Sequence, residues 1–359
     1  MMQRRAFAAS RSLFHDGGNM MKRTGIQVFF TVLTLFSTTT VFAGGTNDKG
    51  KTTQPVKEQV VKFSTPVAPD HANTLAANKF AEIVNKGSGG RLKVEVFPAN
   101  QLGNVKDVIE YVMTGSVHMY IGGTSETSLF QSNWGVMDCP YLFRDFDHLM
   151  KAANSDVIKE MSDSLEKSRG VKILAADMYY GARHLTTKNK EVKTPADLKG
   201  MLIRAPDQPV YLEAVKAMGA TPTPVAFSDL YMALKQGVVD GQENPIPTIY
   251  TYKYYEAQKF IMLTGHMLRV NLVGASAAWF NGLAPDLKKL VNDALKESIK
   301  FNNDLILQQE KDMLTELKKL GMTVVEPDVA AFREAAKDVP KKFEDKWGKG
   351  TADRLAAVK

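Results

Sequence analysis

After its first sixty residues, the chain alternates short runs typical of β-strands with longer runs that have the spacing of amphipathic helices. Residues 92–97 alternate apolar and polar side chains, which is the pattern of a half-buried strand. Residues 70–86 place Ala76, Phe80 and Ile83 on one face at helical spacing, and a glycine follows as a helix end. Because strands and helices alternate in this order, the sequence predicts a mixed α/β fold with largely parallel strands.

The same alternation returns in the second half of the chain, where a predicted strand at 201–205 leads into a predicted helix at 209–218. A chain of 359 residues is long enough for about two domains. We therefore expect two α/β lobes, with the chain crossing between them more than once. The boundaries that we expect are lobe I over 58–180, lobe II over 181–268, and a return to lobe I with C-terminal helices over 269–359.

Residues 1–43 have the features of an upstream extension and a secretion signal. A basic pair at 22–23 precedes an apolar run at 26–42, and Ala43 completes a small-residue cleavage site. We expect cleavage after Ala43, and a flexible, polar leader over 44–57. A retained membrane anchor is the alternative, although the apolar run is short for a membrane span.

The charge pattern does not favour nucleic acid as a partner. The formal net charge is +7, from 46 basic and 39 acidic residues. Residues 1–43 contain five of these bases and one of these acids, so 41 basic and 38 acidic residues remain, a net charge of +3. These bases are interspersed with acids, which is typical of a solvated surface. The single cysteine, Cys139, excludes an internal disulfide, and its apolar neighbours indicate a packed, unreactive thiol.

Motifs for catalysis and for metal binding do not stand out in the sequence. No Gly-x-Ser-x-Gly turn marks a hydrolase nucleophile, and no Gly-x-Gly-x-x-Gly run marks a dinucleotide site. The histidines do not form pairs at the spacing of metal ligands. We therefore predict no cofactor, no metal and no enzyme activity. A periplasmic enzyme that acts on a carboxylate stays open as an alternative.

Two arginines and one asparagine stand at positions where the packing of a core does not require them. Arg204 lies at the end of a predicted strand, and Arg183 lies in a loop that leads into a strand. Asn244 closes a helix and a turn. A guanidinium is a planar fork of N–H donors that binds a carboxylate through two hydrogen bonds. In open α/β sheets, ligands bind beyond the C-terminal ends of the strands, so we expect these side chains to form an anion clamp.

Seven short segments, in this order along the chain, carry a resemblance to a known family. They are Phe-Pro-Ala-Asn-Gln-Leu-Gly (97–103), Pro-Tyr-Leu-Phe-Arg-Asp (140–145), Gly-Ala-Arg-His-Leu-Thr-Thr (181–187), Lys-Thr-Pro-Ala-Asp-Leu-Lys-Gly (193–200), Leu-Ile-Arg-Ala-Pro (202–206), Gly-Ala-Thr-Pro-Thr-Pro-Val-Ala-Phe-Ser (219–228) and Asp-Gly-Gln-Glu-Asn-Pro (240–245). On these segments, nearly the whole chain after the signal resembles the periplasmic solute-binding subunits of tripartite ATP-independent (TRAP) transporters, of the C4-dicarboxylate-binding type.

The resemblance implies a two-lobed periplasmic solute-binding fold with a hinge and a long interlobe helix. It places that long, tyrosine-bearing helix at about 248–265. It implies that Arg204 makes a bidentate pair with the ligand's carboxylate, that Arg183 and Asn244 support this pair, and that Phe227 packs on the ligand. The implied partners are a small organic acid and the membrane permease subunits, and the implied location is the periplasm. A sensor receptor with the same fold stays open as an alternative.

Departures from the sialate-binding members of that family indicate a smaller ligand. Those members carry acidic residues where this chain has Asn104-Val105 and Gly122-Gly-Thr-Ser125, so we do not expect a nine-carbon sugar acid. Asp207 follows the clamp closely and is placed to accept a hydrogen bond from a ligand hydroxyl, which favours a hydroxy or sugar acid. An aromatic or keto acid stays open. The further residues that we expect at the ligand are Tyr180, His184, Asp207 and His71.

Overall fold

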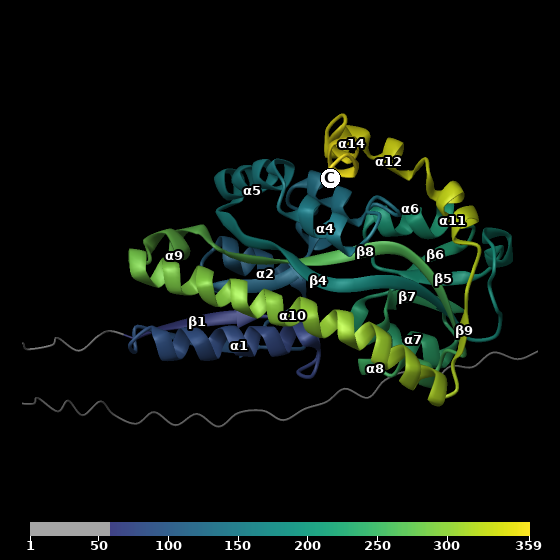
Figure 1. The fold of residues 1–359 in the computed structure, drawn as a ribbon, viewed down its shortest axis with the longest axis horizontal. Coiled ribbons are helices and arrows are strands. Elements are labelled where there is room, and N and C mark those ends of the chain that lie inside the picture. The colour runs from purple at the N-terminus through teal and green to yellow at the C-terminus, as the bar shows by residue number, and fades with distance from the viewer. Residues whose placement is uncertain (1–57) are drawn as a thin grey trace, which may run out of the picture. The chain divides into compact units, whose positions relative to one another are not determined.

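The structure, a computed structural model, describes residues 58–359 (Figure 1). The expected upstream extension, signal peptide and leader lie outside the described residues. Within the described part, none of the helices combines the length and the apolar character that crossing a membrane requires.

One mixed sheet of nine strands organises the described residues. The strand order is β2-β1-β3-β8-β4-β7-β5-β6, and β9 pairs with β8 beside this path. The strands are β1 (Gln59–Ser64), β2 (Leu92–Phe97), β3 (Met119–Gly123), β4 (Val171–Thr187), β5 (Leu202–Ala205), β6 (Thr221–Pro224), β7 (Gly241–Pro245), β8 (Phe260–Ser276) and β9 (Thr323–Val325).

Two strands of 17 residues, β4 and β8, pair antiparallel in the middle of the sheet. Parallel pairs lie at both ends, where β1 joins β2 and β3, and β5 joins β6 and β7. The expectation of largely parallel strands is only partly right, because the pairs β3–β8, β4–β8 and β4–β7 are antiparallel. β4 begins at Val171 and does not run straight to its end at Thr187. The strand continues through a register shift at Gly181, whose φ of 122° suits a bulge.

Capping residues set the ends of several helices. Asn104 caps α2 by accepting a hydrogen bond from the backbone N–H of Asp107, and Gly170 and Gly237 end α5 and α7 in the left-handed conformation. The helices are α1 (Ala72–Gly87), α2 (Val105–Met113), α3 (Thr124–Thr127), α4 (Phe146–Ala153), α5 (Asp156–Arg169), α6 (Pro209–Ala217), α7 (Leu230–Gln236), α8 (Ile246–Thr251), α9 (Ala277–Gly282), α10 (Pro285–Lys319), α11 (Val329–Ala336), α12 (Val339–Lys342), α13 (Glu344–Trp347) and α14 (Thr351–Ala356).

The long interlobe helix is α10, and its predicted position at 248–265 is wrong. The tyrosine-rich segment forms the short helix α8 and a 3-10 turn at Tyr254–Glu256, after which β8 begins at Phe260. Lys253 has a left-handed φ of 54°, which ends the helical path, and the apolar run from Phe260 pairs with β4 and β9 instead. Figure 1 shows α10 running along β4, with α1 beside its first half and α8 near its second half.

Buried apolar side chains form separate clusters at the two ends of the sheet, and α10 contributes to both. At the β1–β3 end, Phe63 belongs to a cluster with Val291 of α10. At the β5–β7 end, Ile249 belongs to a cluster with Leu317 of α10. A third and larger cluster contains residues from both ends, such as Ile109 of α2 and Ile203 of β5, so the apolar core is also continuous between them. The expected lobe boundaries fall within β4 and β8 and remain predictions.

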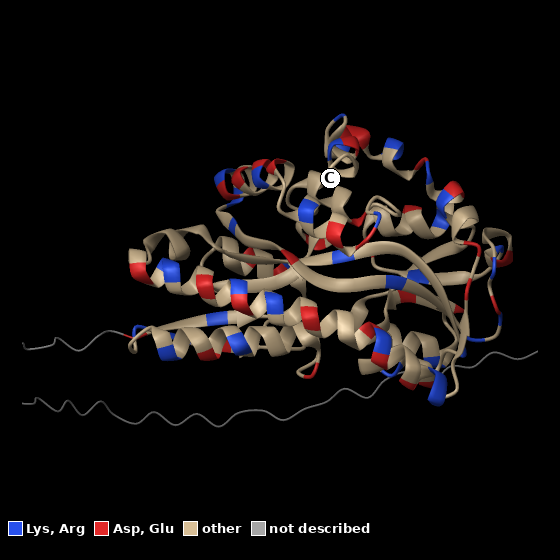
Figure 2. Ribbon diagram, viewed as in Figure 1, with Lys and Arg blue, Asp and Glu red and all other residues tan. Residues whose placement is uncertain are grey.

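Basic and acidic residues alternate along the helices in Figure 2. On α10, Lys289 pairs with Asp293 and Lys300 pairs with Asp304, each one helical turn apart. The helix surfaces in this view are therefore of mixed charge, as the interspersed sequence predicts.

Candidate ligand-binding site

A cavity of about 410 Å³ lies between the two ends of the sheet, where the two lobes face each other. Its walls come from loops and helices at the β1–β3 end, from loops at the β5–β7 end, and from the middle of β4 and β8. The charged and polar residues that line it include Asn104, Lys106, Glu126, Tyr180, Arg183, Arg204, Asp207, Gln208, Asn244, Arg269 and Asn271. Three of these residues are arginines, and their carboxylate partners decide whether the cavity wall carries a buried positive charge.

Arg204 is the one buried cation of the cavity that has no carboxylate partner within residues 58–359. It lies on β5, one residue before the strand ends, as predicted. Its side chain is 2% exposed, and its Nε donates a hydrogen bond to the backbone oxygen of Val225 at 2.9 Å. Burial lowers the pKa of this guanidinium to about 10, so that it stays charged at neutral pH. A buried cation of this kind is costly unless an anion binds it.

Arg183 also lines the cavity, but it is already paired. Its Nη2 donates to Oε1 of Glu243 at 2.7 Å and to the backbone oxygen of Glu243 at 2.7 Å, and its Nε donates to Oε2. His266 contacts the same carboxylate through its Nε2 at 3.1 Å. Burial by itself would raise the pKa of Glu243, but the charge and hydrogen bonds of Arg183 outweigh burial and lower that pKa to about 2. The pair is therefore ionised and contributes no net charge to the cavity.

Strand pairing explains this contact and corrects two local expectations. Arg183 does not lie in a loop, and Asn244 does not close a helix and a turn. Both stand in the antiparallel pair β4–β7, where Arg183 lies opposite Pro245 and His184 lies opposite Asn244. This register brings Glu243 to Arg183, although the two are 60 positions apart. Glu243 was not among the predicted site residues.

A third guanidinium, Arg269 of β8, was also missed. Its Nη2 lies 3.0 Å from Oε2 of Glu126, and its Nε lies 3.5 Å from Oδ1 of Asp138, which is buried. The group stacks over the ring of Tyr180, with its carbon 5.1 Å from the ring centroid. At Gly123, a Cβ atom would lie 1.7 Å from Nη2, so the glycine makes room for this arginine. The sequence signal that could have indicated this arginine was the pair Gly122-Gly123 at the end of β3, because glycine leaves room for a neighbouring side chain.

Four other predicted residues also stand at the cavity. They are Asn244, Phe227, Asp207 and Tyr180. Gln242 fixes the side-chain amide of Asn244, because the Nδ2 of Asn244 donates a hydrogen bond to Oε1 of Gln242 at 2.5 Å. The hydroxyl of Tyr180 accepts a hydrogen bond from Thr248 at 3.0 Å. Direct ligand contact by any of these side chains stays a prediction.

Phe227 connects the cavity to a contact between the lobes. Its ring packs edge-on against Tyr252, with centroids 4.8 Å apart. The hydroxyl of Tyr252 accepts a hydrogen bond at 3.0 Å from the backbone N–H of Ala68, in the loop after β1. A ligand that packs on Phe227 would therefore also support the side chain that joins the two lobes.

The structure does not bring His71 and His184 into the cavity wall. His71 caps α1 through its Nδ1 and stacks behind Tyr180, with ring centroids 5.4 Å apart. His184 accepts a hydrogen bond from the backbone N–H of Gly265 at 3.1 Å. Burial lowers the pKa of His71 to about 4 and that of His184 to about 3, so both are neutral at pH 7. In this structure His71 packs against Tyr180, and His184 lies opposite Asn244 in the β4–β7 pair. Both histidines therefore stand next to residues that line the cavity.

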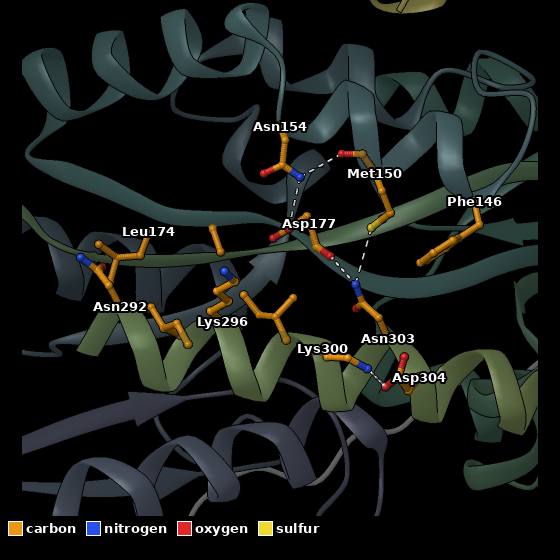
Figure 3. Close-up of a pocket in the computed structure, with 13 residues that line it drawn as sticks. Phe146, Met150, Asn154, Leu174, Asp177, Asn292, Lys296, Lys300, Asn303 and Asp304 are labelled. Atoms are coloured by element: carbon orange, nitrogen blue, oxygen red, sulfur yellow. Dashed lines mark hydrogen bonds and ion pairs between the residues drawn. The ribbon is translucent and has the colours of Figure 1, made fainter. Parts of the chain in front are cut away.

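A second cavity, of about 620 Å³, lies between α4, β4 and α10 (Figure 3). Its polar groups are largely satisfied within the protein, since Asn303 donates to the backbone oxygen of Asp177 at 2.9 Å and Lys300 pairs with Asp304 at 2.5 Å. Lys296, at its edge, is exposed. The larger space thus lacks the buried, unpaired charge that distinguishes the cavity around Arg204.

The described residues do not group three or more His, Cys, Asp or Glu side chains in an arrangement that would hold a metal ion. Cys139 is buried, and burial raises the pKa of its thiol to about 12. Its expected character as a packed, unreactive thiol agrees with this placement.

Comparison with known proteins gives consistent matches over most of the chain. The family model "Bacterial extracellular solute-binding protein, family 7" matches residues 63–346. The C4-dicarboxylate-binding protein DctB of Bacillus subtilis is 35% identical over 267 residues, which cover 74% of this chain and 75% of that protein.

Solved structures of TRAP periplasmic solute-binding proteins are similar as well. One from Bordetella bronchispeptica, whose bound density is assigned as pantoate, is 33% identical with a TM-score of 0.78, and the match covers 84% of this chain and 100% of that one. One from Polaromonas, bound to D-erythronate, is 30% identical with a TM-score of 0.79, and the match covers 84% and 99%.

Proposed function

The chain belongs to family 7 of the bacterial extracellular solute-binding proteins, and we propose that it captures a small organic carboxylate and delivers it to a TRAP membrane permease. The resemblance read from the sequence motifs is confirmed by this match, as is the two-lobed α/β fold. The relatives named above are binding proteins and not enzymes, as expected.

The observation that carries this proposal is the buried guanidinium of Arg204. It lines the cavity between the lobes and has one hydrogen bond to a backbone oxygen and no carboxylate partner in the described chain. A ligand carboxylate would replace the water on this group with charge-assisted hydrogen bonds in a site of low dielectric. Arg183 and Asn244, fixed from behind by Glu243 and Gln242, would offer their remaining donors to the same ligand.

Binding would favour the closed arrangement of the lobes. A ligand shifts a conformational equilibrium by as much as its affinity differs between the two states. In the present structure the lobes meet through the bond between Ala68 and Tyr252 beside the cavity. We propose that a ligand that touches both cavity walls stabilises this arrangement, and that the permease recognises it.

The proposed location is the periplasm, after removal of the signal peptide at residues 1–43. An exported binding protein needs no catalytic group, and its task ends when the carboxylate is passed to the permease. The ligand would therefore leave the protein chemically unchanged, which distinguishes this function from an enzyme that acts on the same acids.

A thermal-shift screen tests the proposal on the purified protein. The panel contains hydroxy, sugar, keto, aromatic and dicarboxylic acids, together with the corresponding neutral lactones or amides as matched controls. A ligand at 100 times its dissociation constant stabilises the native state by about 2.7 kcal/mol, which gives a clear rise in melting temperature. We expect stabilisation by at least one acid and not by its neutral counterpart. Equal stabilisation by the neutral form, or none by any acid, would contradict the proposal.

A further inference from the structure

Three buried asparagines connect the wall of the cavity to the long helix α10. Asn271 of β8 lines the cavity, and its Nδ2 donates a hydrogen bond to Oδ1 of Asn73 at 2.8 Å. Asn73, near the start of α1, donates in turn from its Nδ2 to Oδ1 of Asn302 in α10 at 2.6 Å. All three residues are at most 2% exposed. They form a continuous asparagine relay from the cavity to a helix that contributes to the cores at both ends of the sheet.

The far end of the asparagine relay is anchored by backbone groups of β4. Nδ2 of Asn302 donates to the backbone oxygen of Tyr179 at 2.7 Å and lies 3.0 Å from Oδ1 of Asn303. The backbone N–H of Tyr179 donates to that same Oδ1 at 2.8 Å, and Nδ2 of Asn303 donates to the backbone oxygen of Asp177 at 2.9 Å. A carbonyl oxygen only accepts and a backbone N–H only donates. Neither amide of α10 can therefore be turned round without losing its hydrogen bonds.

This anchor determines the orientation of every amide in the asparagine relay. With its Nδ2 held by Tyr179, Asn302 offers its Oδ1 to Asn73, so Asn73 must present its Nδ2 there and its own Oδ1 to Asn271. Asn271 must then use its Nδ2 for this contact. Its Oδ1 accepts no hydrogen bond from residues 58–359 and is not fully covered, so it remains as an acceptor at the cavity.

The strands beside Asn271 do not offer its amide another hold. Gly123 of β3 and Met178 of β4 lie opposite Asn271 in the sheet. Glycine has no side chain, and the thioether of methionine is only a weak acceptor. Among residues 58–359, the one hydrogen-bond partner of the Asn271 side chain is Asn73. The orientation of this cavity-lining amide therefore depends on the asparagine relay.

We propose that Asn302 is a positioning residue for the ligand-binding cavity. Through Asn73 it holds the amide of Asn271 with the oxygen towards the ligand, although Asn302 itself does not line the cavity. An amide that is already fixed in one orientation does not have to be ordered when the ligand binds, and this favours affinity. The proposal rests on the proposed function, because it requires a ligand in the cavity, and it adds a route from α10 to the bound molecule.

A double-mutant cycle separates positioning from a merely structural role. Calorimetric titration uses the acid that stabilises the wild type most in the thermal-shift screen. Asn302→Ala and Asn271→Ala should each weaken binding by about threefold to tenfold, because each removes the effect of one neutral hydrogen bond to the ligand. In the Asn271→Ala background, Asn302→Ala should have no further effect on affinity, because the relay then has no cavity amide to orient.

Asn303→Ala is the matched control. Asn303 lies beside Asn302 and holds the same stretch of β4, but it is not a link between Tyr179 and Asn271. We expect Asn303→Ala to lower the free energy of unfolding in urea, as Asn302→Ala does, and to keep wild-type affinity. Asn73→Ala interrupts the asparagine relay from α1 and supplies a second variant should Asn302→Ala not fold. It should weaken binding as much as Asn271→Ala does.

Several results would overturn the proposal. They are wild-type affinity in Asn271→Ala, wild-type affinity in Asn302→Ala or Asn73→Ala, and losses that simply add in the double variant. An equal loss of affinity in Asn303→Ala would also overturn it, because the effect would then belong to β4 and not to the asparagine relay. All of these results leave the proposed function intact, since the acid still binds the wild type. Failure of every acid in the thermal-shift screen would instead remove the proposed function, and this proposal with it.

Discussion

Replacing Arg204 by methionine should weaken ligand binding strongly without destabilising the ligand-free protein. Methionine keeps most of the apolar stem of the side chain and removes the charge. In the ligand-free state the buried guanidinium has one hydrogen bond, to the backbone oxygen of Val225, and no carboxylate partner in the described chain. Its removal therefore leaves no buried carboxylate without a partner. The same substitution at Arg183 would leave one, because Glu243 is buried and depends on that arginine.

The expected magnitudes follow from this difference. Losing one partner of a buried charge pair costs about 3–5 kcal/mol. For Arg204→Met this loss appears in the complex only, and it corresponds to a dissociation constant raised by about two to nearly four powers of ten. For Arg183→Met it appears in the folded protein itself, as a free energy of unfolding lowered by about 3–5 kcal/mol. For Arg204→Met we expect a free energy of unfolding within about 1 kcal/mol of the wild type, because the charge that it removes is costly to bury.

Two measurements on each variant separate these effects. Calorimetric titration with the acid that stabilises the wild type most gives the dissociation constant, and urea denaturation without ligand gives the free energy of unfolding. If Arg204→Met lost as much stability as Arg183→Met, the guanidinium would have a structural partner, and the reasoning would be wrong. Retention of near-wild-type affinity by Arg204→Met would refute the clamp itself.

Three further predictions concern groups around the cavity. Tyr252→Phe leaves the N–H of Ala68 without its acceptor, so we expect about fivefold weaker binding through faster ligand release, measured by stopped-flow and compared with the same change at an exposed tyrosine. Gly123→Ala places a Cβ 1.7 Å from the Nη2 of Arg269 and should lower the free energy of unfolding by about 1–3 kcal/mol, as measured by urea denaturation. An unchanged value would contradict the close approach. The pKa values of His71 and His184, lowered by burial to about 4 and about 3, mean that the unfolded chain binds more protons below pH 6.5. Stability should thus be nearly full at pH 7.5 and be lower by about 2 kcal/mol for each histidine at pH 5; a flat urea profile over that range would contradict their burial as neutral groups.

Much of the fold could be predicted because its signals are local. The helical spacing at 70–86 and the alternation at 92–97 correspond to α1 and β2. The tyrosine-rich segment was misplaced for the opposite reason. Its composition suits a helix, but pairing of β8 with β4 and β9, both remote in sequence, decides its structure after Tyr254.

The lining of the cavity was predictable where a residue type has one favoured use, while contact of these residues with a ligand stays a prediction. Arg204, at the end of a short parallel strand, was placed correctly, since an arginine there has no role in packing. Glu243 shows the limit, because an acidic residue has no distinctive signal in sequence. Its role appears only once the β4–β7 pairing brings it to Arg183.

The sequence by itself determined the class of this protein, because ordered motifs and periodic patterns can be recognised without knowledge of contacts. The tertiary structure alone decided which of three arginines is free. Arg183 is neutralised by Glu243 across the β4–β7 pair, and Arg269 of β8 by Glu126 just after β3, while among residues 58–359 Arg204 meets only a backbone oxygen. Charge compensation depends on distances of a few ångströms between strands that are far apart in the chain, and no spacing along one sequence encodes such distances.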